Sequence, residues 1–234
     1  MKNEPVFRWY PLVAAVFVTT LIISNIIAVK LVQLFGLILP AAVVLFPIAY
    51  IFGDILTEVY GYARARQVIW MGFFCNLLAV LAIWMAGALP AADFWSAGVY
   101  AGPTEAQQAY QAILGFTPRL LLASFIAYLV GEFLNAFALA KLKIRTQGRM
   151  LWLRTISSTI LGEGADSAIF ISIAFFGVIP SEGLATAILS QWGFKVAYET
   201  LATPLTYLVV NWLKKAEQQN YFDKETNFNP FSAG

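Results

Sequence analysis

Seven charged side chains stand out in this 234-residue sequence because they lie within long apolar stretches. Side chains of this kind can bind a polar ligand or carry a proton within a membrane. Each would cost roughly 2.5 to 3.5 kcal/mol at the centre of a membrane helix, so each calls for a partner or a function. Six of them form pairs three or four residues apart, which puts both members on one helix face. The pairs are Asp54 with Glu58, Glu163 with Asp166 and Lys195 with Glu199, and the seventh residue is Glu132.

Other polar and aromatic residues extend these pairs into stripes along single helix faces. Polar stripes on several helices are best satisfied when they face one another around an enclosed, hydrated cavity. Counting from the flanking basic residues places this cavity near the middle of the membrane, where carriers bind their substrates. The stripes contain Ser124, Tyr128, Glu132 and Asn135; Thr159, Glu163, Asp166 and Phe170; and Gln191, Lys195 and Glu199, with Phe46, Tyr50 and Phe170 as candidate stacking residues.

Structural roles are the alternative for the same side chains. Asp54 and Glu58 could pair with Arg64 or Arg66 at the membrane surface, where long basic side chains reach water easily. The residues that could serve only to hydrogen-bond neighbouring helices are Ser124, Tyr128 and Asn135.

Lys195 has two candidate partners. Glu199 lies four residues later in the same stretch, but a lysine that precedes the acid is the weaker order within one helix. A partner from another helix, such as Asp166, is therefore favoured. Within their own stretch, Glu163 and Asp166 have no basic residue closer than Arg154, nine residues before Glu163, which also favours a partner on another helix.

The composition is typical of a membrane protein. Hydrophobic residues make up 60% of the chain and charged residues 12%, whereas soluble domains have about 25% charged residues. The formal net charge is +2 and the basic residues are spread along the chain, so we expect no nucleic-acid partner. The chain has no histidine and one cysteine, which excludes histidine-dependent catalysis and thiolate metal clusters. We therefore expect no enzyme activity, no metal site and no cofactor.

Six stretches are long enough to cross a membrane as helices, which takes about 20 residues each. We therefore predict an all-α membrane protein with six transmembrane helices. The first stretch lacks a signal-peptide cleavage pattern, so we expect it to stay in the protein. The loop 90–117 contains a candidate interfacial helix over residues 104–114. The predicted spans are 9–29, 34–57, 68–89, 118–140, 151–179 and 184–213.

Basic residues gather in alternate loops, and acids predominate in the others. The positive-inside rule then places both the N and the C terminus in the cytoplasm. Three spans precede the long loop and three follow it, which fits a 3+3 inverted repeat. We predict one membrane domain over residues 1–213, followed by a polar, loose cytoplasmic tail over 214–234.

Several motifs follow one another in a distinctive order between residues 24 and 213. They are SNIIAVK (24–30), FPIAYIFGDILTEVYGY (46–62), ARQVIW (65–70), RLLLASFIAY (119–128), LWLRTISST (151–159), GADSAIF (164–170) and K-x-x-x-E-x-x-x-x-P (195–204). Any one of them alone would be weak, but their order and spacing are specific. In these motifs the chain resembles the queuosine precursor transporter family, also called the VUT family, a group of bacterial six-span membrane proteins.

The resemblance implies import of 7-deazaguanine precursors of the tRNA nucleoside queuosine, such as preQ0 or preQ1, for queuosine salvage. It implies binding or coupling roles for Asn25, Asp54, Glu58, Arg119, Ser124, Asp166 and Lys195. The chain departs from the family pattern at Glu132 and Asn135, where relatives often have Gln and Asp, and at Glu163, where they have a neutral residue. A homodimer is left open.

The residue types suit such a substrate. A guanine-type base presents an N1–H group and an exocyclic amine side by side, and one carboxylate can accept both. Asp166 or Glu163 could do this, and a second acid would suit the cation of an aminomethyl precursor. The full set of candidate substrate-binding residues is Asn25, Tyr50, Asp54, Glu58, Arg119, Ser124, Tyr128, Glu132, Glu163, Asp166, Phe170, Gln191, Lys195 and Glu199.

Three other functions compete with an autonomous carrier that works by alternating access, with or without proton coupling. A substrate-binding subunit would need an external ATPase, because the chain lacks the phosphate-binding motif G-x-x-x-x-G-K-[ST]. An intramembrane aspartyl protease could use Asp54 and Asp166, but the usual G-x-G-D signature is missing. A purely structural membrane protein is disfavoured by the number of acids at mid-membrane depth.

Overall fold

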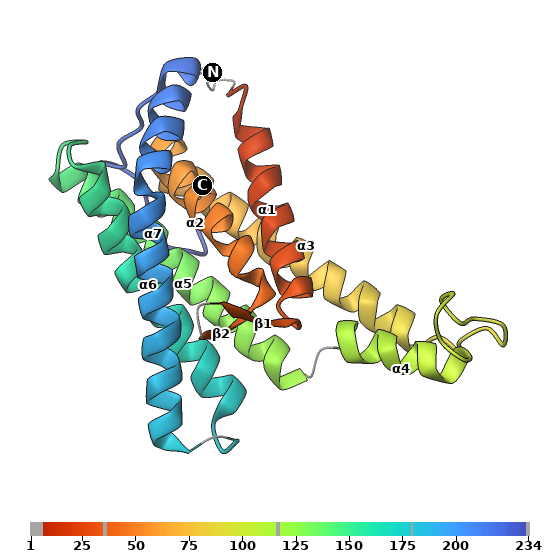
Figure 1. Cartoon of the computed structure of the whole chain (residues 1–234). Coiled ribbons are helices and arrows are strands. Elements are labelled where there is room, and N and C mark those ends of the chain that lie inside the picture. Colours follow the sequence, from red (N-terminus) through yellow and green to blue (C-terminus); the bar gives the residue numbers. More distant parts are fainter. Residues whose placement is uncertain (1–6, 35–36, 116–117, 179, 233–234) are drawn as a thin grey trace.

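The protein is a bundle of helices with one small β-hairpin (Figure 1). This computed structural model describes residues 7–34, 37–115, 118–178 and 180–232. The elements are α1 (Tyr10–Ile27), β1 (Leu31–Leu34), β2 (Leu37–Pro40), a 3₁₀ helix η1 (Ala41–Val44), α2 (Phe46–Ile55), a π-helical turn η2 (Leu56–Tyr60), α3 (Tyr62–Ala88), α4 (Pro103–Leu114), α5 (Pro118–Arg145), α6 (Leu151–Phe175) and α7 (Ser181–Glu217).

Among the described residues, four stretches are long and apolar enough to cross a membrane by length and composition: Tyr10–Ile27, Tyr62–Ala88, Pro103–Arg145 and Leu151–Phe175. The prediction of a helical membrane protein is confirmed at this level. Helix α7 is longer than any of the predicted spans, with 37 residues, but it carries Lys195 and Glu199 in its central part. Helix α2 has only 10 residues. The predicted boundaries at residues 117 and 179 lie outside the described residues.

The short helix expected in the long loop is confirmed. Helix α4 begins one residue before the predicted start and lies beside the far end of α3, away from the other helices (Figure 1). Side chains of α4 bind carbonyl oxygens near the end of α3. Gln107 Nε2 donates to the Gly87 oxygen at 2.9 Å, and the Tyr110 hydroxyl donates to the Ile83 oxygen at 3.1 Å. Helix α4 therefore covers the C-terminal end of α3.

The predicted span 34–57 is wrong in its first half. Strands β1 and β2 pair in antiparallel fashion, with Leu31 opposite Pro40 and Leu34 opposite Leu37, and the helix begins only at Phe46. A short run of Leu, Val and Ile fits a strand as well as a buried helix, so periodicity alone does not separate them. Proline is tolerated in the first turn of a helix but not in its interior, which suits a helix start close to Pro47.

Helices α5 and α6 approach each other closely because both carry glycine where they meet. A Cβ atom on Gly162 would lie 2.6 Å from Asn135 Cβ and 2.7 Å from the Gly131 carbonyl oxygen. A Cβ atom on Gly131 would lie 2.8 Å from Asp166 Cβ. Small residues let membrane helices approach in this way. The close approach brings the polar stripes of α5 and α6 together.

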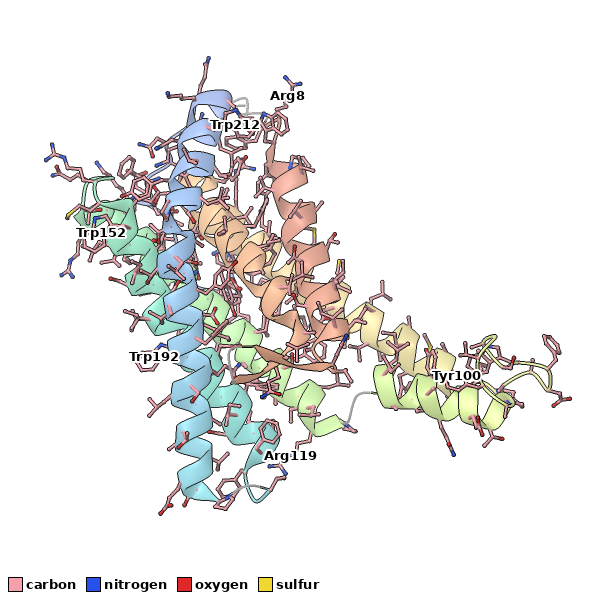
Figure 2. All side chains as sticks on the ribbon, in the orientation of Figure 1. Arg8, Tyr100, Arg119, Trp152, Trp192 and Trp212 are labelled. Carbon is pink, nitrogen blue, oxygen red and sulfur yellow. The ribbon has the colours of Figure 1, made fainter. Side chains whose placement is uncertain are left out.

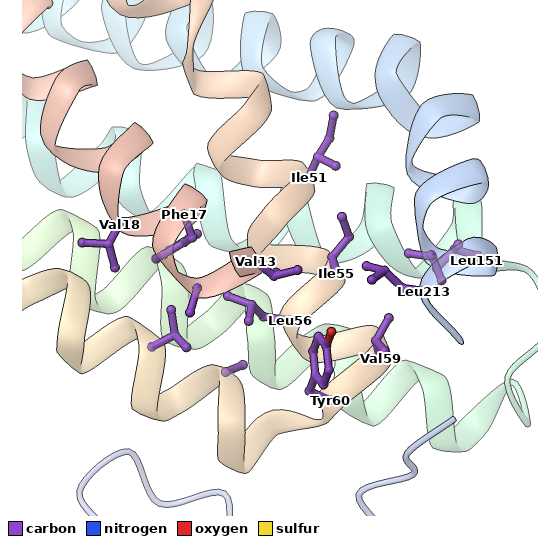
Figure 3. Close-up of a cluster of buried hydrophobic side chains, with 14 residues drawn as sticks. Val13, Phe17, Val18, Ile51, Ile55, Leu56, Val59, Tyr60, Leu151 and Leu213 are labelled. Atoms are coloured by element: carbon purple, nitrogen blue, oxygen red, sulfur yellow. The ribbon is translucent and has the colours of Figure 1, made fainter. Parts of the chain in front are cut away.

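The start of α1 and the end of α7 meet at one end of the bundle. Glu217 accepts hydrogen bonds from the amides of Arg8 and Trp9, at 3.1 and 2.6 Å, and from the Tyr60 hydroxyl at 3.1 Å. Figure 2 shows Arg8 and Trp212 together at this end. An apolar core lies below them (Figure 3), to which Val13, Phe17, Ile55, Leu56 and Leu213 contribute.

The tail after α7 is not loose, contrary to the prediction. Arg66 of α3 donates hydrogen bonds to the carbonyl oxygens of Asn227 and Asn229, at 3.0 and 2.9 Å. Trp70 Nε1 donates to the Pro230 oxygen at 2.9 Å. The polar composition of the tail concealed this arrangement, because the bonds use its backbone carbonyl groups rather than its side chains. The tail thus runs back along the first half of α3.

Gly61 joins the π-helical turn to α3 in a conformation that favours glycine, with φ of +87°. A Cβ atom at this position would overlap the ring of Tyr221 in the tail. The next residue, Tyr62, donates its amide to the buried carboxylate of Asp223, so the tail also caps the N-terminus of α3. Gly61 therefore serves both the turn and the docking of the tail.

Replacement of Gly61 by alanine should destabilise the folded protein by about 1 to 2 kcal/mol from the backbone conformation, and further because of the overlap with Tyr221. Gly98→Ala is the matched control, because Gly98 has φ of +74° and nothing within 4 Å of the added atom. Thermal unfolding of the two variants in detergent measures the difference. Equal unfolding midpoints would contradict the packing of Tyr221 against Gly61.

Candidate functional site

Lys195 of α7 is held between two carboxylates of α6. Its Nζ atom lies 2.7 Å from Glu163 Oε2 and also donates to Asp166 Oδ2. The side chains of Lys195 and Glu163 are buried, whereas that of Asp166 is 20% exposed. The expected partner on another helix is thus confirmed, and the pairing within α7 is not formed. We refer to Lys195, Glu163 and Asp166 as the lysine triad.

Tyr50 lies beside the lysine triad and belongs to a third helix, α2. Its ring centroid lies 5.8 Å from Lys195 Nζ, and its side chain is hydrogen-bonded to Glu163 and Lys195. An aromatic ring at this distance can interact with the ammonium group through its π face. The lysine triad and Tyr50 together therefore provide a cation, two acids and one aromatic face.

A second group of buried polar side chains lies next to the triad. Asn135 Nδ2 donates to Asp54 Oδ1 at 2.9 Å. Glu199 is fully buried, and neither of its carboxylate oxygens has a hydrogen-bond partner among the described residues. Asp54 interacts electrostatically with Glu199, and Glu199 with Glu163. We refer to Asp54, Asn135 and Glu199 as the acid pocket.

Glu132 of α5 links the two groups. Its carboxylate would lie 3.4 Å from a Cβ atom on Gly53, so it reaches the backbone of α2. It interacts electrostatically with all three members of the lysine triad and also with Asp54. The absence of a side chain at Gly53 leaves room for this carboxylate beside α2.

The triad, the acid pocket and Glu132 together hold five carboxyl groups and one ammonium group. Glu163 lies halfway along the 25-residue α6, about 18 Å from its start. Burial of so many like charges is costly unless protons or a ligand compensate them. The arrangement therefore suits a ligand that donates hydrogen bonds or carries positive charge.

Glu58 belongs to a different cluster near the end of the bundle. Its Oε1 atom lies 2.8 Å from Arg154 Nη2, 2.6 Å from Lys214 Nζ and 3.6 Å from Lys143 Nζ. The carboxylate is fully buried. It ties the π-helical turn to the end of α5, the start of α6 and the end of α7. This arrangement supports a structural role for Glu58, and a role in substrate binding stays a prediction.

Arg154 and Lys143 are not among the candidate residues predicted from the sequence, although both are buried. The position of each residue along the chain could have indicated that it is buried, because each lies inside a helix rather than in the loop that joins α5 to α6. The suggested pairing of Glu58 with Arg64 or Arg66 is not formed.

Three candidate residues make other contacts that the structure describes. Asn25 Nδ2 of α1 donates to Asn76 Oδ1 of α3 at 3.0 Å, and the Tyr128 hydroxyl donates to the Ile69 oxygen at 2.9 Å. Arg119 donates to the oxygens of Ile173 and Phe176 at the end of α6, and Figure 2 shows it at the opposite end of the bundle from Arg8. These contacts hold helices together.

The remaining candidates lie on the helices that carry the triad and Glu132. Ser124 on α5, Phe170 on α6 and Gln191 on α7 are partly buried. The Phe170 ring contacts Phe175 with centroids 6.3 Å apart. The side chain of Phe46 lies outside the described residues. In the part of the chain that the structure describes, no group of three or more His, Cys, Asp or Glu side chains is placed to hold a metal ion.

Comparison with known proteins identifies the family. Residues 40–209 match the family described as "Putative vitamin uptake transporter". A "Probable queuosine precursor transporter" of Bacillus subtilis (strain 168) is 30% identical over 201 residues, which cover 84% of this chain and 82% of the relative. The chain belongs to this transporter family. The resemblance noted in the sequence motifs is therefore confirmed, and the protein is a multi-pass membrane transporter and not an enzyme.

Two further relatives match a shorter part of this transporter. The "Queuosine precursor transporter" of Escherichia coli (strain K12) is 28% identical over 131 residues, which cover 56% of this chain and 52% of the relative. A "Probable queuosine precursor transporter" of Haemophilus influenzae is 28% identical over 134 residues, which cover 56% of this chain and 49% of the relative. No solved structure matches the chain.

Glu58→Gln should strongly destabilise the transporter, by about 3 to 5 kcal/mol, because it leaves three buried or half-buried cations without their shared carboxylate. Glu182→Gln at the exposed start of α7 is the control for the loss of one acid. Thermal unfolding in detergent measures the stability of both variants. An unchanged unfolding midpoint in Glu58→Gln would show that the cluster does not hold the helix ends together.

Proposed function

We propose that this transporter imports 7-deazaguanine precursors of queuosine, such as preQ0 or preQ1, across the bacterial cytoplasmic membrane. The observation that carries the proposal is Lys195 held between Glu163 and Asp166, with Tyr50 beside them, halfway along the helices. The names of the relatives support the substrate class.

The lysine triad offers what a flat guanine-type base requires. The N1–H group and exocyclic amine of the base can donate to one carboxylate, for which the partly exposed Asp166 is the best placed. Lys195 can donate to the carbonyl oxygen of the base once its ammonium group breaks the bond to one of its two acids. Tyr50 supplies an aromatic face. Glu163 or Glu132 remains available for the cation of an aminomethyl group.

We further propose six transmembrane spans, with α2 and its π-helical turn as the second and α7 as the sixth. The basic ends of α5 and α7 and the start of α6 meet at the Glu58 cluster, which supports a common cytoplasmic side for both termini. The membrane domain then covers residues 1–213 and is followed by the docked tail. The 3+3 inverted repeat and a homodimer are the remaining parts of this proposal.

Alternating access around the triad is the proposed mechanism. Helix α7 is fixed at its C-terminal end, where Lys214 binds Glu58 and Glu217 binds Tyr60. Pro204 lies between this end and Lys195, and proline removes one backbone hydrogen bond from a helix. The half of α7 that carries Lys195 can therefore bend relative to the fixed half, which would open the triad to one side at a time.

Purified transporter in liposomes should exchange labelled preQ1 or preQ0 with unlabelled compound trapped inside. Exchange of labelled substrate in liposomes that contain this chain alone supports an autonomous carrier. Uptake in cells together with no exchange in liposomes would favour the alternative of a binding subunit with an external ATPase. A lack of exchange and of cellular uptake would overturn the proposed function.

Asp166→Asn should reduce uptake at least tenfold while membrane insertion is kept, because the amide no longer accepts both donors of the base and weakens the bond to Lys195. Asp93→Asn in the exposed loop before α4 is the matched control. Uptake of labelled substrate, normalised to the amount of protein in the membrane, measures the effect. Unchanged uptake in Asp166→Asn would remove Asp166 from the site.

A further inference from the structure

We propose that the acid pocket is the proton-binding site of this transporter, distinct from the lysine triad that binds substrate. One proton is shared between Asp54 of α2 and Glu199 of α7 and enters the cell with each substrate molecule. This inference rests on the proposed import function. It assigns to Asp54 and Glu199 a role different from the substrate contact expected from the sequence.

The acid pocket is buried, and the Asn135 amide is the one hydrogen-bond donor to its acids among the described residues. Glu199 is 0% exposed and Asp54 is 1% exposed. Both oxygens of Glu199, the Oδ2 atom of Asp54 and the Oδ1 atom of Asn135 have no hydrogen-bond partner among the described residues. Four buried acceptor atoms without a partner are a costly arrangement unless a donor is added. A proton on one carboxyl group is the smallest donor that satisfies it.

No basic side chain is paired with the acid pocket in the part of the chain that the structure describes. The groups that act on Asp54 are Glu199, Glu132 and Glu58, besides the amide of Asn135, and the group that acts on Glu199 from α6 is Glu163. All of these charges are negative. Two interacting carboxylates that lack a cation do not both ionise, so one of them retains a proton.

The nearby cations are already engaged by other acids. Lys195 donates to Glu163 and Asp166. The three cations nearer the helix ends, Lys143, Arg154 and Lys214, surround Glu58. The acid pocket therefore lies between two ion-paired clusters and belongs to neither.

The position of the acid pocket couples it to the triad. Glu199 follows Lys195 by four residues on α7, and Asp54 follows Tyr50 by four residues on α2, so each pair shares a helix face. The same two helices thus carry the acid pocket and the substrate site, one helical turn apart. Protonation from the outer aqueous phase forms an O–H bond in the acid pocket, and release to cytoplasmic water breaks it.

A sodium ion is the alternative cargo for such a pocket. It would require about six oxygen ligands in a hard-cation geometry, whereas the acid pocket presents four acceptor atoms without a partner. The proton is therefore favoured. The test below includes a sodium gradient, whose success in place of a pH gradient would overturn the proposal.

The experiment uses the full chain in liposomes with the membrane potential clamped at zero, and labelled preQ1 or preQ0 as the probe. With one proton per substrate, an outside pH one unit below the inside pH should drive about tenfold accumulation. Glu199→Gln should abolish this accumulation but keep substrate exchange at equal pH on both sides. Asp54→Asn should behave in the same way, and Glu182→Gln on the exposed start of α7 should accumulate substrate like the wild type.

The outcomes separate this inference from the import function. Exchange without any response of the wild type to a pH gradient overturns the proton site and leaves import intact. Full pH-driven accumulation by Glu199→Gln overturns the assignment to the acid pocket. No exchange by the wild type overturns the import function itself. Glu199→Asp keeps a carboxyl group at this position, so it should recover at least part of the accumulation that Glu199→Gln loses. The thermal stability of Glu199→Asp in detergent controls for folding.

Discussion

The charge of Lys195 inside an apolar bundle is the constraint on which the rest of the site depends. An ammonium group removed from water needs close counter-charges, and here it takes two from the next helix. Because Glu163 and Asp166 share one face of α6, a single lysine fixes the rotation of α6 relative to α7. Tyr50 then brings α2 to the same point. The lysine triad thus organises the helices as well as the chemistry.

Charge is distributed unevenly along the bundle. The middle holds more acids than cations, whereas the Glu58 cluster near one end holds more cations than acids. Helix α2 and its π-helical turn run through both regions and carry Tyr50, Asp54 and Glu58 in succession. The rigid, cation-rich end and the acid-rich middle therefore have different tasks: the first holds helix ends together, and the second suits protons and a ligand with donors.

The sequence singled out the charged side chains that the structure brings together, but it predicted the fold around them less well. Charges in apolar stretches identified Lys195, Glu163, Asp166, Asp54 and Glu199 because their cost in a membrane does not depend on tertiary detail. The hairpin at β1 and β2 was missed because an apolar run fits strand and helix alike. The docked tail was missed because its hydrogen bonds to Arg66 and Trp70 of α3 use backbone carbonyl groups, which composition does not reveal.

By itself, the sequence determined that this is a helical membrane protein of the queuosine precursor transporter type, and that polar stripes must face one another. Hydrophobic length and helical spacing are local properties, so they can be read along the chain. Only the tertiary structure decided which acids meet Lys195, that Glu58 lies among three cations, and that Asp54 and Glu199 have no cationic partner among the described residues. Such pairings depend on the rotation and depth of each helix, which the packing of its neighbours sets and spacing within one helix does not.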